Sequence, residues 1–434
     1  MRIKKKQLQE ALKKASRFTG DSLPVTMQVL VDGENQLIVA TDLHTRFETP
    51  VEIKDFERTV APPAVVYPDD DLKADMEGLS KDQIMALGEY AGVTGKSKKV
   101  VVDKIMAASQ AKADSEALNN SPIFLREKFC VDPRHLGKII DSLEGSAEDY
   151  ITLTPESESV AEGLFGDQTR LTMLAVGDNF QRLMIMPADD FPEWFDVQDA
   201  AKVATVSGKD LRYVAGICPR APKGYNKGTH QPFKEHVSFN AAHSAMVSTD
   251  GNRLHHIGLD VEQDVMISAH ALEGMAALAK DGNIEIAYSP SVRYATLTHG
   301  QDKATVRVDS DMTFPEFKDI LNSEQSVTID VAKFGKLLKQ AVLVTGENYR
   351  AVELTFNGGL DARVENPERG TYTKESIEFE GNIDPEIKVS INPVFLLEAM
   401  KPADKTVQLG LTGAGRPIIV TAEKCRAAIM PMRT

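Results

Sequence analysis

Hydrophobic residues in this chain follow a helical period in six short segments and alternate with polar residues in most segments between them. Leu136, Ile140 and Leu143 show the helical spacing, with apolar side chains recurring every three or four positions. Residues Val352–Phe356 alternate instead, which is typical of a strand with one buried face. The spacing predicts helices at Lys6–Ser16, Asp132–Leu143, Gly208–Cys218, Ala269–Asp281, Val331–Val344 and Asn392–Met400.

Two motifs recur along the chain and indicate internal repeats. A Phe-Pro-Glu-aromatic motif begins at Phe191 and again at Phe314. An Ile-Met-Pro motif begins at Ile185 and again at Ile429, and a Thr-Asp motif followed by Arg occurs in the first and second thirds. A repeat of roughly 120 residues has the size of a domain and is too long for a solenoid unit.

The repeats predict three tandem domains, at 1–198, 199–321 and 322–434, each with two helices. Runs of strands with few helices are typical of the α+β class with antiparallel sheets. The first domain is longer than the others, and its excess lies at 56–126, an Ala- and Lys-rich stretch with helical character. We interpret this stretch as a small all-α insertion in a surface loop.

Charge is distributed unevenly, although the chain as a whole carries −14. Acidic residues gather in predicted strands and loops, whereas basic residues recur on predicted helices. Such helices could hold a polyanion through its phosphates, without reading sequence; the alternative is that they are ordinary solvated faces. The candidate DNA-facing residues are Lys13, Lys14, Arg17, Arg134, Lys138, Lys209, Arg212, Lys333, Lys336 and Lys339.

Catalytic and cofactor motifs are absent from the sequence, which has no nucleophile elbow, zinc-protease motif, phosphate-binding loop or paired-cysteine motif. We therefore expect neither an enzyme nor a cofactor or metal. His255 and His256 are adjacent, so they point to opposite sides of a strand, and a satisfied structural pair is favoured over a metal site. Three dispersed cysteines and a charged N-terminal segment fit a cytoplasmic protein.

The most specific segments are Thr249–Leu254, Phe314–Phe317 and Met430–Arg433. Together they resemble the β sliding clamp (β subunit) family of bacterial DNA polymerase III, over nearly everything outside 56–126. The resemblance implies a homodimeric ring of six domains, with helices lining a hole around duplex DNA and sheets outside. It also implies a processivity factor that tethers the polymerase α subunit, the clamp loader and other proteins carrying clamp-binding motifs. The alternative is a clamp-fold DNA-binding scaffold of a phage or mobile element, acting outside chromosomal replication.

The resemblance also implies a hydrophobic cleft for partner peptides, in which Arg253 and the backbone near Gly251 fix polar groups. Three residues depart from the family pattern: Asn252, Asp319 and Thr434. The resemblance therefore does not fix which partner peptides the cleft prefers. At the protomer interface the equivalent apolar positions are Leu183, Leu343 and Val344. The cleft residues carried over are Thr249, Gly251, Arg253, Leu254, Pro315, Ile320, Ile429, Met430, Pro431 and Met432.

The insertion is similar to SAP or Rho-N-like modules, which consist of two helices joined by an extended loop. Lys96, Lys98 and Lys99 precede its second predicted helix, where backbone amides and lysines together favour phosphate. The insertion is therefore a candidate for nucleic-acid binding, and the alternatives are protein docking or an inert appendage.

Overall fold

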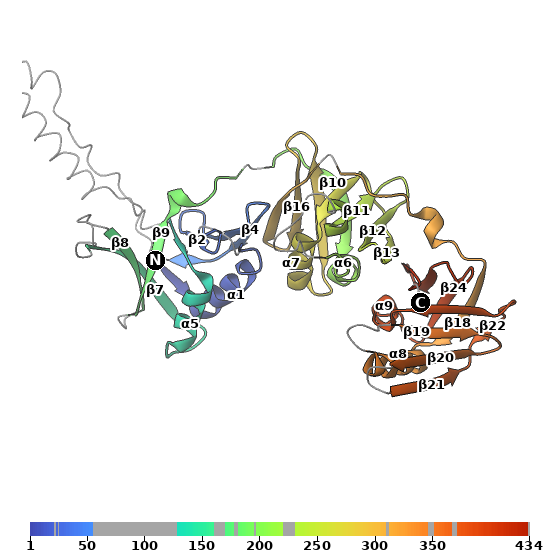
Figure 1. Cartoon of the computed structure of the whole chain (residues 1–434). Coiled ribbons are helices and arrows are strands. Elements are labelled where there is room, and N and C mark those ends of the chain that lie inside the picture. Colours follow the sequence, from blue (N-terminus) through green and yellow to red (C-terminus); the bar gives the residue numbers. More distant parts are fainter. Residues whose placement is uncertain are drawn as a thin grey trace, which may run out of the picture. The chain divides into compact units, whose positions relative to one another are not determined.

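The computed structural model describes residues 1–20, 23–24, 26–54, 128–159, 170–177, 181–194, 197–219, 231–309, 312–345, 351–366 and 371–432. The predicted insertion at 56–126, with Lys96, Lys98 and Lys99, lies outside these residues. The chain divides into two compact units (Figure 1). The first comprises Met1–Asp42 and Glu48–Glu193, and the second comprises Leu43–Phe47 and Trp194–Thr434.

The first unit is built on antiparallel strands in the order β3-β2-β6-β9-β8-β7-β1-β5. Helices α1 (Lys5–Ala15) and α5 (Pro133–Ser142) contact each other. The strands are β1 (Arg2–Lys4), β2 (Val29–Asp32), β3 (Leu37–Thr41), β4 (Thr45–Pro50), β5 (Ile53–Lys54), β6 (Lys128–Val131), β7 (Tyr150–Ser159), β8 (Arg170–Val176) and β9 (Gln181–Pro187), followed by a 3₁₀ turn at Ala188–Asp190.

Helix α5 shows how the sequence sets a helix start. The Asp132 carboxylate accepts hydrogen bonds from the backbone N–H groups of Arg134 and His135, at 2.7 and 3.2 Å. Pro133 follows at the first helical position, where its missing N–H costs nothing. Leu136 and Ile140 are fully buried, which explains the helical spacing of the apolar residues.

The second unit begins with two runs of four hydrogen-bonded antiparallel strands, β10-β15-β16-β17 and β14-β11-β12-β13. Helices α6 (Gly208–Ala215) and α7 (Ala269–Ala279) contact each other. The strands are β10 (Ala201–Ser207), β11 (His236–Asn240), β12 (Ala245–Thr249), β13 (Arg253–Gly258), β14 (Val265–Ser268), β15 (Asn283–Ser289), β16 (Tyr294–His299) and β17 (Asp302–Arg307), with 3₁₀ turns at Pro232–Glu235 (η2) and Lys318–Leu321 (η3).

The rest of this unit repeats the pattern around one continuous apolar core with Phe334 and Phe356 fully buried. Helices α8 (Val331–Val344) and α9 (Pro393–Ala399) contact each other. The strands are β18 (Gln325–Asp330), β19 (Val352–Phe356), β20 (Leu360–Asn366), β21 (Thr371–Ile377), β22 (Glu380–Gly381), β23 (Ile387–Ile391), β24 (Thr406–Leu411), β25 (Ile418–Ala422) and β26 (Cys425–Ile429).

One sheet joins these two parts of the second unit. Strand β13 pairs antiparallel with β26, in a register that places Arg253 opposite Ile429 and Leu254 opposite Ala428. The sheet β14-β11-β12-β13 therefore continues through β26-β25-β24-β18-β22. Backbone pairing and the packing of Leu254 with Ala428 hold residues near 253 beside residues near 429, although they are far apart in sequence.

The six predicted helices are all present, and the prediction of an α+β fold with antiparallel sheets is confirmed. Two helices end two or three residues earlier than predicted. Helix α6 stops at Ala215, before Gly216, and α7 stops at Ala279 because Lys280 adopts a positive φ of 52°. The domain boundaries at 198 and 321 stay predictions, as does the placement of the helices inside a ring.

Gly208 offers a test of how tightly α6 packs on the end of α7. A Cβ at Gly208 would collide with the backbone carbonyl of Lys280 and lie 3.0 Å from that of Ala276. We expect Gly208→Ala to lower the free energy of unfolding by about 1–3 kcal/mol, because backbone must move. The measurement is the denaturant midpoint of the full chain.

Gly335→Ala is the matched control for this substitution. Gly335 lies inside α8, and no described atom comes within 4 Å of the position of its Cβ. Alanine should stabilise that helix by about 0.5–1 kcal/mol, since it is the better helix former. Equal effects of the two substitutions would contradict the proposed packing constraint at Gly208.

Candidate functional site

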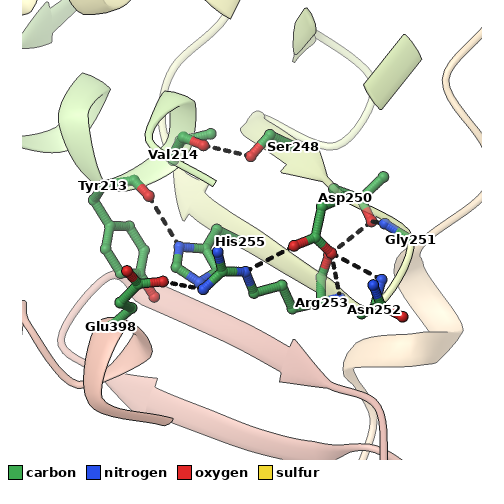
Figure 2. Close-up of polar contacts among 10 residues, drawn as sticks. Tyr213, Val214, Ser248, Asp250, Gly251, Asn252, Arg253, His255 and Glu398 are labelled. Carbon is green, nitrogen blue, oxygen red and sulfur yellow. Dashed lines mark hydrogen bonds and ion pairs between the residues drawn. The ribbon is translucent and has the colours of Figure 1, made fainter. Parts of the chain in front are cut away.

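A tight hairpin loop between β12 and β13 carries the first group of predicted cleft residues. The Asp250 carboxylate accepts hydrogen bonds from the N–H groups of Asn252 and Arg253, at 2.8 and 3.0 Å. The Thr249 hydroxyl donates to the carbonyl of Arg253 and accepts from the N–H of Gly251. Figure 2 shows these contacts converging on one loop. The N–H groups of 251, 252 and 253 are thus satisfied within the loop.

Gly251 meets two separate requirements of this loop. Its φ of +91° lies in the left-handed region that side chains rarely adopt. A Cβ would also strike the Lys234 side chain, whose Cε would be 2.9 Å away. Lys234 comes from η2, so the loop is covered by a segment that precedes β11.

Arg253 connects the loop to α9. Its Nε donates to the Asp250 carboxylate at 3.0 Å, and its terminal nitrogen donates to Glu398. The guanidinium carbon lies 4.2 Å from the centre of the Phe395 ring. Only 10% of the Arg253 side chain is exposed, so its charge must be paired, and two carboxylates provide the pairing. The guanidinium is therefore already engaged within the chain, although a role in fixing a peptide stays a prediction.

His255 lies beneath this arginine and is 1% exposed. Its ring stacks on Tyr213 with centroids 4.3 Å apart, and its Nδ1 is 2.9 Å from the Tyr213 carbonyl oxygen. Because a carbonyl only accepts, Nδ1 carries the proton and Nε2 is an acceptor. Nε2 has no hydrogen-bond partner among the described residues. We expected a structural histidine pair with all hydrogen bonds made, and only one ring nitrogen of His255 makes one.

The two histidines lie in different surroundings, as the strand alternation predicts. His256 packs near Phe317, with ring centroids 5.9 Å apart, whereas His255 contacts Tyr213 of α6. The described residues contain no group of three or more His, Cys, Asp or Glu placed to hold a metal ion. Burial raises the pKa of the Cys130 thiol to about 12 and that of Cys425 to about 11, so both stay protonated at neutral pH.

The segment after β26 runs past the hairpin loop and then along β23. The N–H of Met430 donates to the Asn252 carbonyl at 2.9 Å, and the N–H of Met432 donates to the Ser390 carbonyl at 2.8 Å. Turn η3, which carries Ile320, contacts β26. Thr249, Gly251, Arg253, Leu254 and the 429–432 segment are thus brought together, with Ile320 on a neighbouring turn.

Several side chains of this region are apolar yet exposed. Met430 is 44% exposed, Met432 39% and Ile320 41%. Val394, in the first turn of α9, is 40% exposed and was not among the predicted residues. By contrast Leu254 and Ile429 are buried in the core, so they lie beneath the exposed side chains of this region. Pro315 is exposed, and its neighbour Phe314 packs on the cluster that contains Leu254.

The predicted DNA-facing residues occupy helices or the turn after one, as expected, and all but Lys14 are exposed. Lys14 is half-buried, and Arg212 is partly engaged by the Ala276 carbonyl at 2.7 Å. At the predicted protomer interface Leu343 is 78% exposed, whereas Val344 packs partly against the core. Leu183 is half-buried on β9. Among the described helices, none has the length and apolar character that crossing a bilayer requires.

The buried His255 gives a pH-dependent prediction. Burial lowers the pKa of His255 from 6.5 to about 4. Between these values the unfolded chain binds a proton that the folded chain refuses, so stability falls as pH drops from 6.5 to 4. The loss should approach roughly 3 kcal/mol from this residue. We expect His255→Phe to flatten the stability profile over that window in denaturant titrations; an unchanged slope would exclude His255 as the source.

A family model described as DNA polymerase III beta subunit, C-terminal domain, matches residues 321–433. No curated protein matches the chain. Solved structures match over 100% of this chain. They include DNA polymerase III subunit beta from Pseudomonas aeruginosa, with 17% identity, 99% of that chain covered and a TM-score of 0.67. The sliding clamp from Bacillus subtilis matches with 15% identity, 98% coverage and a TM-score of 0.67.

A third structure, a sliding clamp from Pseudomonas aeruginosa bound to griselimycin, matches with 17% identity, 99% of that chain covered and a TM-score of 0.68. At these identities the whole-chain likeness is one of fold. The chain therefore has, over its whole length, the fold of the bacterial DNA polymerase III beta subunit, and its residues 321–433 match the C-terminal domain of that family.

Proposed function

We propose that this chain is a DNA sliding clamp, a processivity factor that encircles duplex DNA as a homodimeric ring. It tethers a replicative polymerase and other partners and catalyses no reaction itself. The observation that carries the proposal is the match to bacterial clamp structures along the full chain. The placement of exposed basic and apolar residues supports it at three surfaces: the helices, the groove beside the hairpin loop and the protomer interface.

Basic side chains on the helices are the first support. Lys333, Lys336 and Lys339 all lie exposed on α8, one helical turn or less apart. Lysines placed in this way bind DNA phosphates without reading the base sequence, and the affinity falls as the salt concentration rises. A ring linked topologically to DNA needs only such weak contacts, which lets an acidic protein remain on DNA and slide.

The exposed apolar side chains beside the hairpin loop are the second support. Met430, Met432, Ile320 and Val394 are each about two-fifths exposed and belong to neighbouring segments. Methionine is flexible and polarisable, so a groove built from it adapts to different apolar partners. We infer that partner proteins insert apolar side chains of a short peptide here. The binding of griselimycin by a clamp of the same fold is consistent with a ligand-binding groove.

Exposed apolar residues on α8 and β9 are the third support. Leu343 is 78% exposed and Met184 is 59% exposed. Large side chains this exposed are often covered by a partner subunit. We infer that Leu343 of one protomer and the Leu183–Met184 segment of the other meet in the dimer.

Topological linkage distinguishes a clamp from an ordinary DNA-binding protein. The protein is loaded onto nicked circular DNA with a clamp loader and passed through a sizing column in moderate salt. We expect it to remain on the circles and to be released when a restriction enzyme linearises them. Light scattering of the free protein should give the mass of a dimer. Release that requires high salt rather than a free DNA end would contradict the proposal.

The apolar groove makes a second prediction. Met430→Ala combined with Met432→Ala removes two exposed side chains that we assign to partner binding. We expect affinity for a hydrophobic clamp-binding peptide to fall by at least about tenfold, roughly 1.4 kcal/mol, with the dimer mass unchanged. Fluorescence anisotropy of a labelled peptide measures it.

Val292→Ala is the control for the methionine variant. Val292 is 44% exposed and lies between β15 and β16, away from the groove. It should leave peptide affinity unchanged. If the double methionine variant binds the peptide with unaltered affinity, the peptide site does not include Met430 and Met432.

A further inference from the structure

A cavity of about 260 Å³ lies inside the second unit, next to the Arg253 network but apart from the exposed methionines. Its walls come from α6 and α9, from the turns that follow them, and from β13 and β26. None of the residues assigned above to the peptide groove lines it. Its size suits a compact molecule of a dozen or so non-hydrogen atoms, somewhat below the usual range for ligand pockets.

The charges that line the cavity do not balance. Its two carboxylates each have a basic partner outside the lining: Asp210 pairs with Lys424 at 2.6 Å, and Glu398 shares Arg253 with Asp250. Lys209 and Lys401 also line the cavity, and neither has an ion pair within the described structure. They come from α6 and from the turn after α9.

Arg212 adds a third cation to the same wall. One of its nitrogens donates to the Ala276 carbonyl, and the other lies 3.4 Å from the exposed Asp281 carboxylate. A weak, solvated contact of that length offsets little of its charge. Basic side chains therefore outnumber acidic ones along the wall of this open cavity, which favours an anion.

His255 contributes an unused hydrogen-bond acceptor to the cavity wall. It lines the cavity, its Nδ1–H is committed to the Tyr213 carbonyl, and its Nε2 has no partner in the described structure. Buried polar groups are rarely left unpaired, and such exceptions call for an explanation. A ligand with an O–H or N–H group would supply the missing donor.

We propose that this cavity binds a phosphate group carried on a small hydroxylated framework, with the phosphate held by Lys209 and Lys401 and a hydroxyl donating to His255. The site bridges the parts of the chain that carry α6 and α9. None of its residues belongs to the peptide groove, whereas Lys209 and Arg212 are also among the candidate DNA-facing residues. The phosphate could belong to a free phosphate monoester or to a DNA backbone, and the chemistry of recognition is the same.

Ribose 5-phosphate is a suitable probe, because it combines a phosphate with hydroxyl donors at the right size. Isothermal titration of the full-length protein without DNA should show saturable binding with a dissociation constant of about 1 mM or below. Ribose, which lacks the phosphate, should not bind measurably. Absence of saturable ribose 5-phosphate binding overturns the proposal.

Two variants assign the binding to this cavity. Lys401→Gln should weaken ribose 5-phosphate binding by at least about fivefold, through loss of one charge-assisted contact. Lys405→Gln is the matched control, since Lys405 is an exposed lysine of the same turn region that does not line the cavity. If the two variants lose equal affinity for ribose 5-phosphate, the phosphate is attracted by surface lysines in general. That result would contradict binding in this cavity.

The acceptor role of His255 has its own readout. His255→Phe should weaken ribose 5-phosphate binding and, at about pH 8, leave the weaker binding of methyl phosphate unchanged, because methyl phosphate is then a dianion with no O–H group. If both weaken equally, the hydroxyl contact is wrong. A short DNA duplex added in competition then identifies the source. Displacement assigns the phosphate to the DNA backbone, and no displacement assigns it to a free small molecule.

Discussion

The antiparallel pairing of β13 with β26 is the contact on which the second unit depends. It places Arg253 beside Ile429 and so fixes where every neighbouring side chain lies. Arg253 then reaches Glu398 on α9, and the Tyr213 hydroxyl donates to the Ala399 carbonyl at 3.3 Å. The N–H of Met430 donates to Asn252 in the hairpin loop. Without the strand pairing, the exposed methionines, the arginine network and the cavity would not be neighbours.

Charge is arranged on two scales in this protein. Over the whole chain acidic residues predominate, and a net negative charge repels polyanions. Locally, exposed lysines on α8 and at the start of α6 create positive surface where phosphate is expected. Buried positive charge is treated differently: Arg253 is enclosed by two carboxylates and an aromatic ring, because an unpaired guanidinium in that position would be strongly destabilising.

Local sequence was enough to predict the helices and the fold class. The spacing of apolar residues on α5 and the capping Asp132 both act within a few positions, so they can be read without the structure. The segment Thr249–Arg253 was singled out only through a recurring motif and the family resemblance, and its hairpin loop, closed by hydrogen bonds among its own residues, is known from the structure. The corresponding cleft assignments came from a family resemblance, and the structure supports their proximity for most of them.

Contacts between segments far apart in sequence could not be predicted. Glu398 looked like an ordinary helical glutamate, yet it pairs with Arg253, 145 positions away. Val394 and Phe395 gave no signal of their own, because their position depends on how α9 packs beside β13. The cavity was not predicted for the same reason, since its lining comes from four elements, α6, β13, α9 and β26, whose approach is set by tertiary packing.

The shared sheet has a mechanical consequence. Separating the part that carries α6 from the part that carries α9 would require unzipping the β13–β26 ladder, whose five residue pairs run from Arg253–Ile429 to Ile257–Cys425, and withdrawing Arg253 from Glu398. These bonds lie side by side across one seam, so bending at this joint strains all of them together. The β13–β26 pairing therefore makes this joint rigid. A hinge for any large rearrangement of the second unit would have to lie outside this pairing.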